Sequence, residues 1–208
     1  EALDGGDPTR EVEHRDRVMM LEAPFTGRAK QVTILENRFS KIYWGETRNT
    51  ALVREYDSSR NWYYTWLVDP DNPDIPDRLL WSHSVNERYE HPGFPLMRQL
   101  PNGKRAMRVH SNSIFLNGNG SSVEGDRPFL DKLNLVKFER ERLFKCDEDS
   151  YEAVVALLSD DGSEYVTRHE TENEHPNYYS RKVGELERQP LTEFKDPAKS
   201  LREVQKKL

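Results

Sequence analysis

The stretch at residues 118–122, Gly-Asn-Gly-Ser-Ser, comes nearest to a catalytic motif in this sequence. A nucleophile elbow has the pattern G-x-S-x-G, which places its serine on a strained turn between a strand and a helix. Neither Ser121 nor Ser122 is followed by glycine two residues later, and the pattern occurs nowhere else in the 208 residues. We therefore interpret the stretch as a flexible connection between two strands and predict no catalytic residue.

Two other stretches contain residue types that bind metals. Residues 169–175 place two imidazoles and three carboxylates close together, but zinc needs three or four ligands in fixed geometry, and we expect this run to be a mobile hairpin tip. Residues 69–74 resemble a calcium loop with alternating oxygen ligands. Asp74 stands where that loop needs glycine, and Leu80 where it needs glutamate. We predict a plain turn there, and neither a metal site nor a cofactor site in the chain.

The charge and hydrophobic content exclude several classes of protein. Hydrophobic residues make up 35% of the chain and charged residues 33%, so the core must be thin and distributed. Aromatic residues at 10% argue against disorder. The net charge of −6 arises from interspersed acidic and basic residues, which form no basic stripe for nucleic acid. No apolar run approaches the roughly 20 residues that cross a bilayer. We expect a folded protein that binds neither nucleic acid nor membrane.

Cys146 is the single cysteine, which excludes an intrachain disulfide and a multi-cysteine metal site. No histidine or basic helix terminus lies near it in the sequence to activate the thiol, so we expect it to be inert. The chain begins with Glu1, without the basic and apolar regions of a signal peptide. A processed protein and an excised segment both fit this beginning, and the compartment stays open.

Short strands follow one another in groups of four. Alternating apolar residues and turn residues predict four strands in residues 37–90, and the pattern recurs in residues 91–149 and 150–196. The first strands begin near residues 39, 95 and 151, a period of about 56 residues. The expected strands are 17–23, 31–35, 39–44, 51–56, 62–68, 78–81, 95–99, 105–109, 129–135, 139–144, 151–157, 164–168, 177–182 and 189–193.

One antiparallel sheet per repeat is typical of a β-propeller blade. A β-sandwich has similar turn spacing, but its strands do not repeat in groups of four. We therefore predict an all-β fold, a partial β-propeller of about three and a half four-stranded blades. Residues 1–36 are expected to form a half blade and residues 197–208 an exit linker. Residues 113–116 either extend the strand at 105–109 past a bulge or form an extra element.

The local sequence resembles the propeller of the prolyl oligopeptidase family of serine peptidases, and most closely its glutamyl endopeptidase-like branch. The resemblance covers nearly the whole chain. It is carried by residues 14–18, 23–25, 51–56, 62, 65–66, 78–81, 84–89, 124–130, 151–152 and 154–158. It implies that a seven-bladed propeller caps an α/β-hydrolase domain, restricts the access of peptides, and leaves the Ser, Asp and His triad to the hydrolase domain.

A preference for glutamate implies cationic groups where the substrate carboxylate arrives. Arg54, Arg108 and Arg168 fall at equivalent places in three predicted second strands, and an arginine fork binds carboxylates bidentately. We favour the alternative that each arginine pairs with acidic residues of the adjacent blade, and we predict no catalytic, cofactor-binding or metal-binding residue.

Two functional hypotheses follow from the predicted blades. In the first, the chain is a non-catalytic propeller segment that gates peptide access to a hydrolase domain missing from it. In the second, it is a free-standing propeller that holds a partner protein. The expected partners are an α/β-hydrolase domain and peptide substrates, and the exposed edge strands of an incomplete propeller also suggest self-association.

Overall fold

The computed structural model describes residues 1–197, and every regular element in that part of the chain is a β-strand. These residues contain no helix that could span a membrane. The chain forms two compact units. The first comprises Glu1–Glu87, Met97–Val109 and Leu135–Phe138, and the second comprises Arg88–Leu96, His110–Asn134 and the residues from Glu139 onward. The exit linker predicted at residues 197–208 lies outside the described residues, apart from residue 197.

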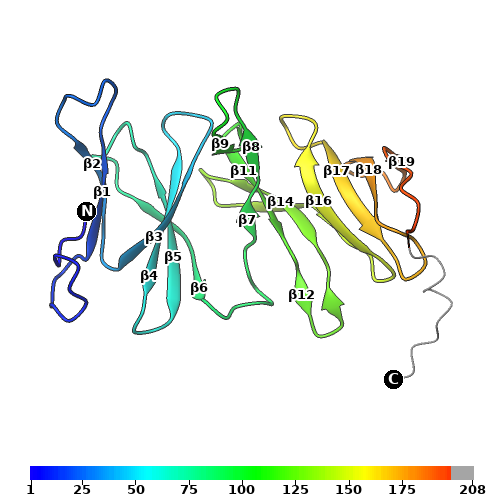
Figure 1. The fold of residues 1–208 in the computed structure, drawn as a ribbon, viewed down its shortest axis with the longest axis horizontal. Helices are drawn as coiled ribbons and strands as arrows, with labels where there is room; N and C mark the ends of the chain where they lie inside the picture. The colour runs from blue at the N-terminus through cyan, green and yellow to red at the C-terminus, as the bar shows by residue number, and fades with distance from the viewer. Residues whose placement is uncertain (198–208) are drawn as a thin grey trace. The chain divides into compact units, whose positions relative to one another are not determined.

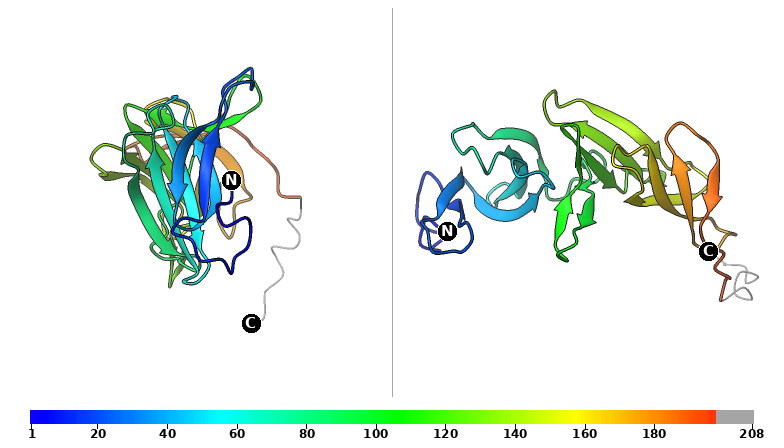
Figure 2. Two further views of the ribbon diagram at one scale, coloured as in Figure 1. Left: turned by 90° about the vertical axis from the view of Figure 1, so that its left-hand side faces the viewer. Right: turned by 90° about the horizontal axis from the view of Figure 1, so that it is seen from above.

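The first unit contains a sheet whose strand order follows the chain, β3-β4-β5-β6, and a separate pair, β1-β2 (Figure 1). The strands are β1 (Asp16–Met20), β2 (Lys30–Leu35), β3 (Arg38–Trp44), β4 (Ala51–Asp57), β5 (Trp62–Val68) and β6 (Arg78–Ser84). The β1-β2 pair lies beside the β3-β6 sheet in both Figures 1 and 2. Four antiparallel strands joined in sequence are the architecture of a propeller blade.

The second unit contains a sheet of the same order, β16-β17-β18-β19, and a five-stranded sheet of order β10-β11-β14-β15 in which β7 also pairs with β11. The strands are β7 (Phe94–Pro95), β10 (Val109–His110), β11 (Ser113–Gly118), β12 (Ser121–Ser122), β13 (Gly125–Asp126), β14 (Phe129–Asn134), β15 (Arg140–Lys145), β16 (Tyr151–Leu157), β17 (Glu164–Glu170), β18 (Asn177–Lys182) and β19 (Arg188–Pro190). The predicted all-β propeller fold is therefore confirmed.

The inner part of the middle repeat differs from the prediction. Of residues 95–99 and 105–109, only Pro95 in β7 and Val109 in β10 belong to the sheet of that blade, whereas β8 (Met97–Gln99) and β9 (Arg105–Met107) form a separate pair. The central place belongs to β11, whose Ile114, Phe115 and Leu116 are all completely buried. The run in β11 is apolar on both faces of the strand and therefore suits the middle of a sheet, whereas β8 and β9 carry exposed charged side chains.

The β8-β9 pair is attached to the end of β3 within the first unit. Gly45 forms a parallel bridge with Met107, and the backbone N–H of Glu46 donates to the Met107 carbonyl at 3.1 Å. Arg98 donates to the Glu46 carboxylate at 2.7 Å. A Cβ atom added at Gly45 would lie 2.7 Å from the Thr50 carbonyl oxygen, so this close approach requires glycine.

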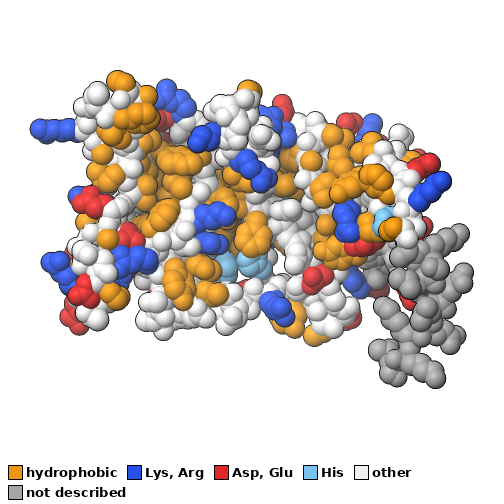
Figure 3. Space-filling view, in the orientation of Figure 1, with side chains coloured by type: hydrophobic (Ala, Val, Ile, Leu, Met, Phe, Trp, Pro, Cys, Tyr) orange, Lys and Arg blue, Asp and Glu red, His pale blue; other side chains and the backbone are white. Residues whose placement is uncertain are grey.

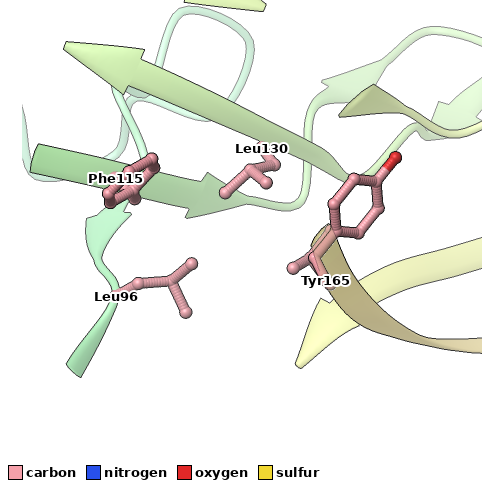
Figure 4. Close-up of a cluster of buried hydrophobic side chains, with 5 residues drawn as sticks. Leu96, Phe115, Leu130 and Tyr165 are labelled. Carbon is pink, nitrogen blue, oxygen red and sulfur yellow. The ribbon is translucent and has the colours of Figure 1, made fainter. Parts of the chain in front are cut away.

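Each unit has its own small hydrophobic core. In the first, Val53 and Val68 of the four-stranded sheet pack with Val32 and Leu35 of β2. In the second, Leu96, Phe115, Leu130, Val154 and Tyr165 pack together (Figure 4). Small cores of this kind are what a chain with 35% hydrophobic and 33% charged residues can supply.

A carboxylate is buried in each of the three large sheets and in the β1-β2 pair, although an unpaired buried charge is costly. These carboxylates belong to Asp16 on β1, Glu55 on β4, Asp131 on β14 and Glu152 on β16, and none of these residues is more than 6% exposed. Glu55 accepts hydrogen bonds from the backbone N–H of Asn37 at 2.8 Å and from Nε1 of Trp66 at 2.9 Å. One side chain thus joins β5 to the connection between β2 and β3.

The buried carboxylate of the last sheet joins four strands. Glu152 on β16 accepts from Nε and Nη2 of Arg181 on β18, both at 2.7 Å, and from the hydroxyl of Thr167 on β17. Arg188 on β19 lies 4.0 Å from the same carboxylate. Burial by itself raises the pKa of Glu152, but the hydrogen bonds from Arg181 and Thr167 and the charge of Arg181 act together in the opposite direction and leave the pKa lowered.

His169 on β17 lies next to this network and is 3% exposed. Its ring meets the edge of Tyr179 at 5.8 Å, and its Nδ1 lies 3.5 Å from the Glu174 carboxylate. Burial lowers the pKa of His169 below 6.5, and the nearby cation of Arg188 lowers it further. The folded state therefore favours the neutral imidazole.

Truncation of a core leucine tests the packing of the first unit. Leu52→Ala removes a completely buried side chain and is expected to lower the free energy of unfolding by about 2–5 kcal/mol. The matched variant Leu79→Ala removes a side chain that is 41% exposed and should change it far less. All four tryptophans lie in residues 1–87, so tryptophan fluorescence during urea unfolding reports on this unit. Equal losses in the two variants would contradict the assigned core.

Stability of the second unit is expected to depend on the charge of His169. Because its folded pKa lies below the unfolded value of 6.5, the unfolded chain binds the proton more tightly. The neutral His169 ring therefore contributes its full share to the free energy of unfolding above pH 6.5, and this contribution is lost as the pH falls toward the folded pKa. The free energy of unfolding is measured at each pH from the hydrogen exchange of β16–β18 amides at increasing urea concentration. In His169→Gln this free energy should depend less on pH below 6.5. An unchanged slope in the variant would refute the assignment.

Candidate functional site

A hollow of about 850 Å³ lies within the second unit, beside β15 and the β12-β13 hairpin. Three parts of the chain line it: the segment before β7, residues 120–129 around the hairpin and the start of β14, and β15 with the residues that follow. The lining residues are Tyr89, Glu90, His91, Gly120, Ser121, Ser122, Glu124, Arg127, Phe129, Arg140, Arg142, Lys145, Cys146, Asp147 and Glu148. The stretch that the sequence made prominent, residues 118–122, therefore contributes to a concave surface.

Arginine side chains of β15 form one wall of this hollow. The Arg142 guanidinium lies 4.4 Å from the ring centroid of Phe129, and its Nη2 donates to the buried Asp131 carboxylate at 3.2 Å. Arg140 lies 3.4 Å from the same carboxylate and donates to the Pro92 carbonyl at 3.3 Å. A guanidinium that is stacked and paired in this way is held in one orientation, so the wall is preorganised.

The hairpin owes its shape to glycine. Gly120 has a φ of +59°, and a Cβ atom at this position would lie 2.0 Å from the Arg127 carbonyl oxygen. The Ser121 hydroxyl donates to Asp126 at 2.7 Å, and the Ser122 hydroxyl donates to a carbonyl of the same hairpin at 2.8 Å. Both hydroxyls therefore stabilise the turn, as expected for a connection between strands.

Charges of both signs surround the hollow. The cations are Arg127, Arg140, Arg142 and Lys145, and the carboxylates are Glu90, Glu124, Asp147 and Glu148. Figure 3 shows the same interspersion of basic and acidic side chains over one face of the molecule. Such a lining suits a polar, hydrogen-bonding ligand better than an apolar one.

The acidic stretch at residues 69–74 is a turn, as predicted. The Asp69 carboxylate accepts from the backbone N–H groups of Asp71 and Asn72, each at 3.1 Å, and from the Asn72 side chain at 3.1 Å. Its oxygens are thus used to close the loop. Across residues 1–197 no cluster of three or more His, Cys, Asp or Glu side chains could hold a metal ion.

The stretch at residues 169–175 differs from its prediction. His169 belongs to β17 and is buried, so the expectation of a mobile hairpin tip is wrong for this residue. It packs against Tyr179 beside the Glu152 network, and within the stretch its Nδ1 lies 3.5 Å from the Glu174 carboxylate. His175 follows in the turn, where its carbonyl accepts from the Asn177 side chain at 3.3 Å.

Cys146 is buried at the end of β15 and is a free thiol. Its sulfur accepts from the backbone N–H of Glu152 at 3.0 Å and contacts the Ser150 carbonyl oxygen at 3.2 Å. These contacts link β15 to the start of β16, so the thiol has a structural role in the connection between the two sheets.

Two of the three predicted arginines have partners within their own blade. Arg54 donates to the Ser40 hydroxyl at 3.3 Å and lies 4.3 Å from the ring centroid of Tyr63. Arg168 donates to Glu170, two residues along the same strand, at 2.8 Å. The predicted pairing with an adjacent blade is therefore wrong for these two residues, because closer partners are available on the same sheet.

Arg108 pairs with a carboxylate, as predicted, but it does not lie on a second strand of a sheet. Its Nε lies 3.8 Å from the carboxylate of Glu46, which follows β3. The residue lies between β9 and β10 instead of on a second strand, so it is not equivalent to Arg54 and Arg168.

Neither the hollow nor its arginine wall was predicted from the sequence. Arg140 and Arg142 alternate along β15 and so share one face of that strand. This spacing is visible in the sequence, but their common partner Asp131 lies on β14 in a sheet whose inner strands were predicted in the wrong place. The alternation was the one available signal.

No model of a known protein family matches the chain. Over its whole length it is 32% identical to a probable chloroplastic glutamyl endopeptidase from Oryza sativa subsp. japonica and 30% identical to one from Arabidopsis thaliana. It covers 24% and 23% of those two proteins. The chain therefore spans about a quarter of the length of the curated relatives that it matches.

Two solved structures are also similar, each at 15% identity. One is TolB from Acinetobacter baumannii, with a TM-score of 0.43 over 86% of this chain and 38% of that chain. The other is the β-propeller domain of the Trilobed protease from Pyrococcus furiosus, with a TM-score of 0.45 over 84% and 49%. The suggested resemblance is confirmed by the sequence comparison. The chain is similar over its whole length to one segment of these two probable glutamyl endopeptidases, about a quarter of their length.

Proposed function

We propose that this chain is the non-catalytic propeller segment of a serine peptidase of the prolyl oligopeptidase family, and that it gates the access of peptides to an α/β-hydrolase domain. The full-length match to a quarter of the glutamyl endopeptidases carries this proposal. Four-stranded blades and a sequence without a nucleophile elbow support a role in access instead of bond cleavage.

In this proposal the chain contributes successive blades to a larger ring. Residues 1–36 form the outer half of one blade, and residues 37–90, 91–149 and 150–196 form the next three. Residues 197–208 lead toward the hydrolase domain. Each blade is built on an antiparallel sheet, and a ring of such sheets narrows the path along its axis.

The hollow beside β15 is the surface where we expect a peptide to make contact. Its wall of Arg140 and Arg142 offers guanidinium groups fixed by Phe129 and Asp131. Carboxylates at the same hollow can bind the basic groups of a peptide. A lining of both signs would retain polar peptides and hold them only weakly, as a gate requires.

The purified chain is expected to hydrolyse no peptide, because the triad belongs to the hydrolase domain. A quenched fluorescent peptide containing glutamate measures cleavage, and a fluorophosphonate probe reports any activated serine. The same segment followed by a hydrolase domain should cleave the peptide and take up the probe.

Robust cleavage by the chain alone would overturn the proposal. The matched control is the chain with both Ser121 and Ser122 replaced by alanine, which should behave as the parent does. If the natural reading frame ends near Leu208, no hydrolase domain follows, and the alternative of a free-standing propeller that binds a partner protein would be correct.

A further inference from the structure

The sequence contains three Asn-Gly pairs, two of which stand in the glycine-rich stretch before β12. They are Asn102-Gly103, Asn117-Gly118 and Asn119-Gly120. In such a pair the backbone nitrogen of the glycine can attack the side-chain carbonyl carbon of the asparagine, because glycine has no Cβ atom to block the approach. Each pair is therefore a potential site of spontaneous deamidation, provided that the fold leaves both groups free to move.

Asparagine is a chemically labile residue, and this reaction needs only water. A new bond joins the glycine nitrogen to Cγ of the asparagine, the backbone amide proton passes to solvent, and the side-chain nitrogen takes up a proton and leaves as ammonia. Water then opens the cyclic imide at either carbonyl carbon, which gives aspartate or isoaspartate. Both products carry a new negative charge, and isoaspartate also lengthens the backbone by a methylene group.

The fold protects Asn117, which belongs with Gly118 to β11. This strand pairs with β7 on one side of Asn117 and with β14 on the other. The side-chain nitrogen of Asn117 donates to the Val154 carbonyl at 3.4 Å. A Cβ atom added at Gly118 would lie 2.7 Å from the Phe129 ring, so the backbone there has little room to rotate. Imide formation at Asn117 would require this part of the sheet to open.

The turn between β8 and β9 restrains Asn102 in a different way. Its Oδ1 accepts from the backbone N–H of Lys104 at 3.0 Å, which holds the side chain against the turn. The N–H of Gly103 donates to the Leu100 carbonyl at 2.9 Å. The side-chain carbonyl and the attacking nitrogen are thus both engaged, although Asn102 is exposed.

Asn119 has neither kind of restraint. It lies between β11 and β12, outside any strand, and it is exposed. Within residues 1–197 its side chain makes no hydrogen bond, and the N–H of Gly120 has no acceptor. A backbone N–H without a partner in the protein is left to water, so both groups that must meet are free to do so.

We propose that Asn119 is a site of spontaneous deamidation in the folded chain, and that hydrogen bonds of the fold protect Asn102 and Asn117. The product adds a carboxylate directly before Gly120, which lines the hollow beside β15. This inference does not depend on the proposed peptidase function.

Isoaspartate at this position also changes the β12-β13 hairpin. The Gly120 carbonyl accepts from the Arg127 N–H at 3.0 Å, and a Cβ atom at Gly120 would lie 2.0 Å from the Arg127 carbonyl oxygen. An additional methylene group directly before Gly120 does not fit this close approach unless one of the two segments moves. The isoaspartate form is therefore expected to lose the hydrogen bond from Arg127, whereas the aspartate form keeps it.

Peptide mapping by mass spectrometry tests the proposal. The folded chain and the chain unfolded in guanidinium chloride are incubated at mildly alkaline pH, and fragment ions locate each replacement of –NH2 by –OH. In the folded chain Asn119 should convert about tenfold faster, or more, than Asn102 and Asn117, since these two must wait for local opening. In the unfolded chain the rates should become similar, because the fold no longer distinguishes the three pairs.

Two variants serve as controls. Asn119→Gln has a longer side chain that closes a less favourable ring, so it should remove the conversion at this position and leave the rate at Asn102 unchanged. Asn119→Asp carries the charge of the products without the longer backbone. The Arg127 amide should exchange with deuterium faster in the purified isoaspartate form than in Asn119→Asp.

Equal rates at Asn119 and Asn102 in the folded chain would overturn the proposal. A ratio of rates that guanidinium chloride leaves unchanged would do so as well, because the sequence alone would then decide the reactivity. Equal Arg127 exchange in the isoaspartate form and in Asn119→Asp would refute the assigned effect on the hairpin.

Discussion

The constraint on which this structure depends is the pairing of buried carboxylates in sheets with little apolar area. Hydrophobic and charged residues are almost equally frequent, so burial of apolar surface alone leaves little margin. Acidic side chains nevertheless occupy inward positions in every large sheet. Each must keep hydrogen-bond donors around it, since an isolated buried charge costs several kcal/mol or more.

This requirement determines how the arginines are used. Arg181, Arg140 and Arg142 bind carboxylates of their own sheets, and Arg38 binds Asp4 and Asp16 across the β1-β2 pair and β3. These arginines are therefore largely engaged in the fold. Arg140 and Arg142 are held by Asp131 and also line the hollow beside β15.

Much of the fold was predictable from short-range patterns. The strands at residues 62–68, 151–157 and 177–182 were predicted with the bounds that β5, β16 and β18 have, because alternation and turn residues mark both ends. The inner part of the middle sheet was not, because the repeat favoured residues 95–109 over the apolar β11. The buried carboxylates of the three large sheets lie on different strands: Glu55 on the second, Asp131 on the third and Glu152 on the first. The sequence repeat therefore does not align them. Their arginine partners are determined by which strands pair.

A double-mutant cycle on Glu152 and Arg181 tests the role of the paired carboxylates most directly. The side chains of both residues are largely buried. Glu152→Gln, Arg181→Gln and the double variant are compared by the unfolding free energy of β16–β18 from hydrogen exchange. The account predicts that each single change is destabilising and that the coupling energy lies at about 1–3 kcal/mol. Additive effects, with a coupling near zero, would contradict the claim that paired buried carboxylates hold these sheets together.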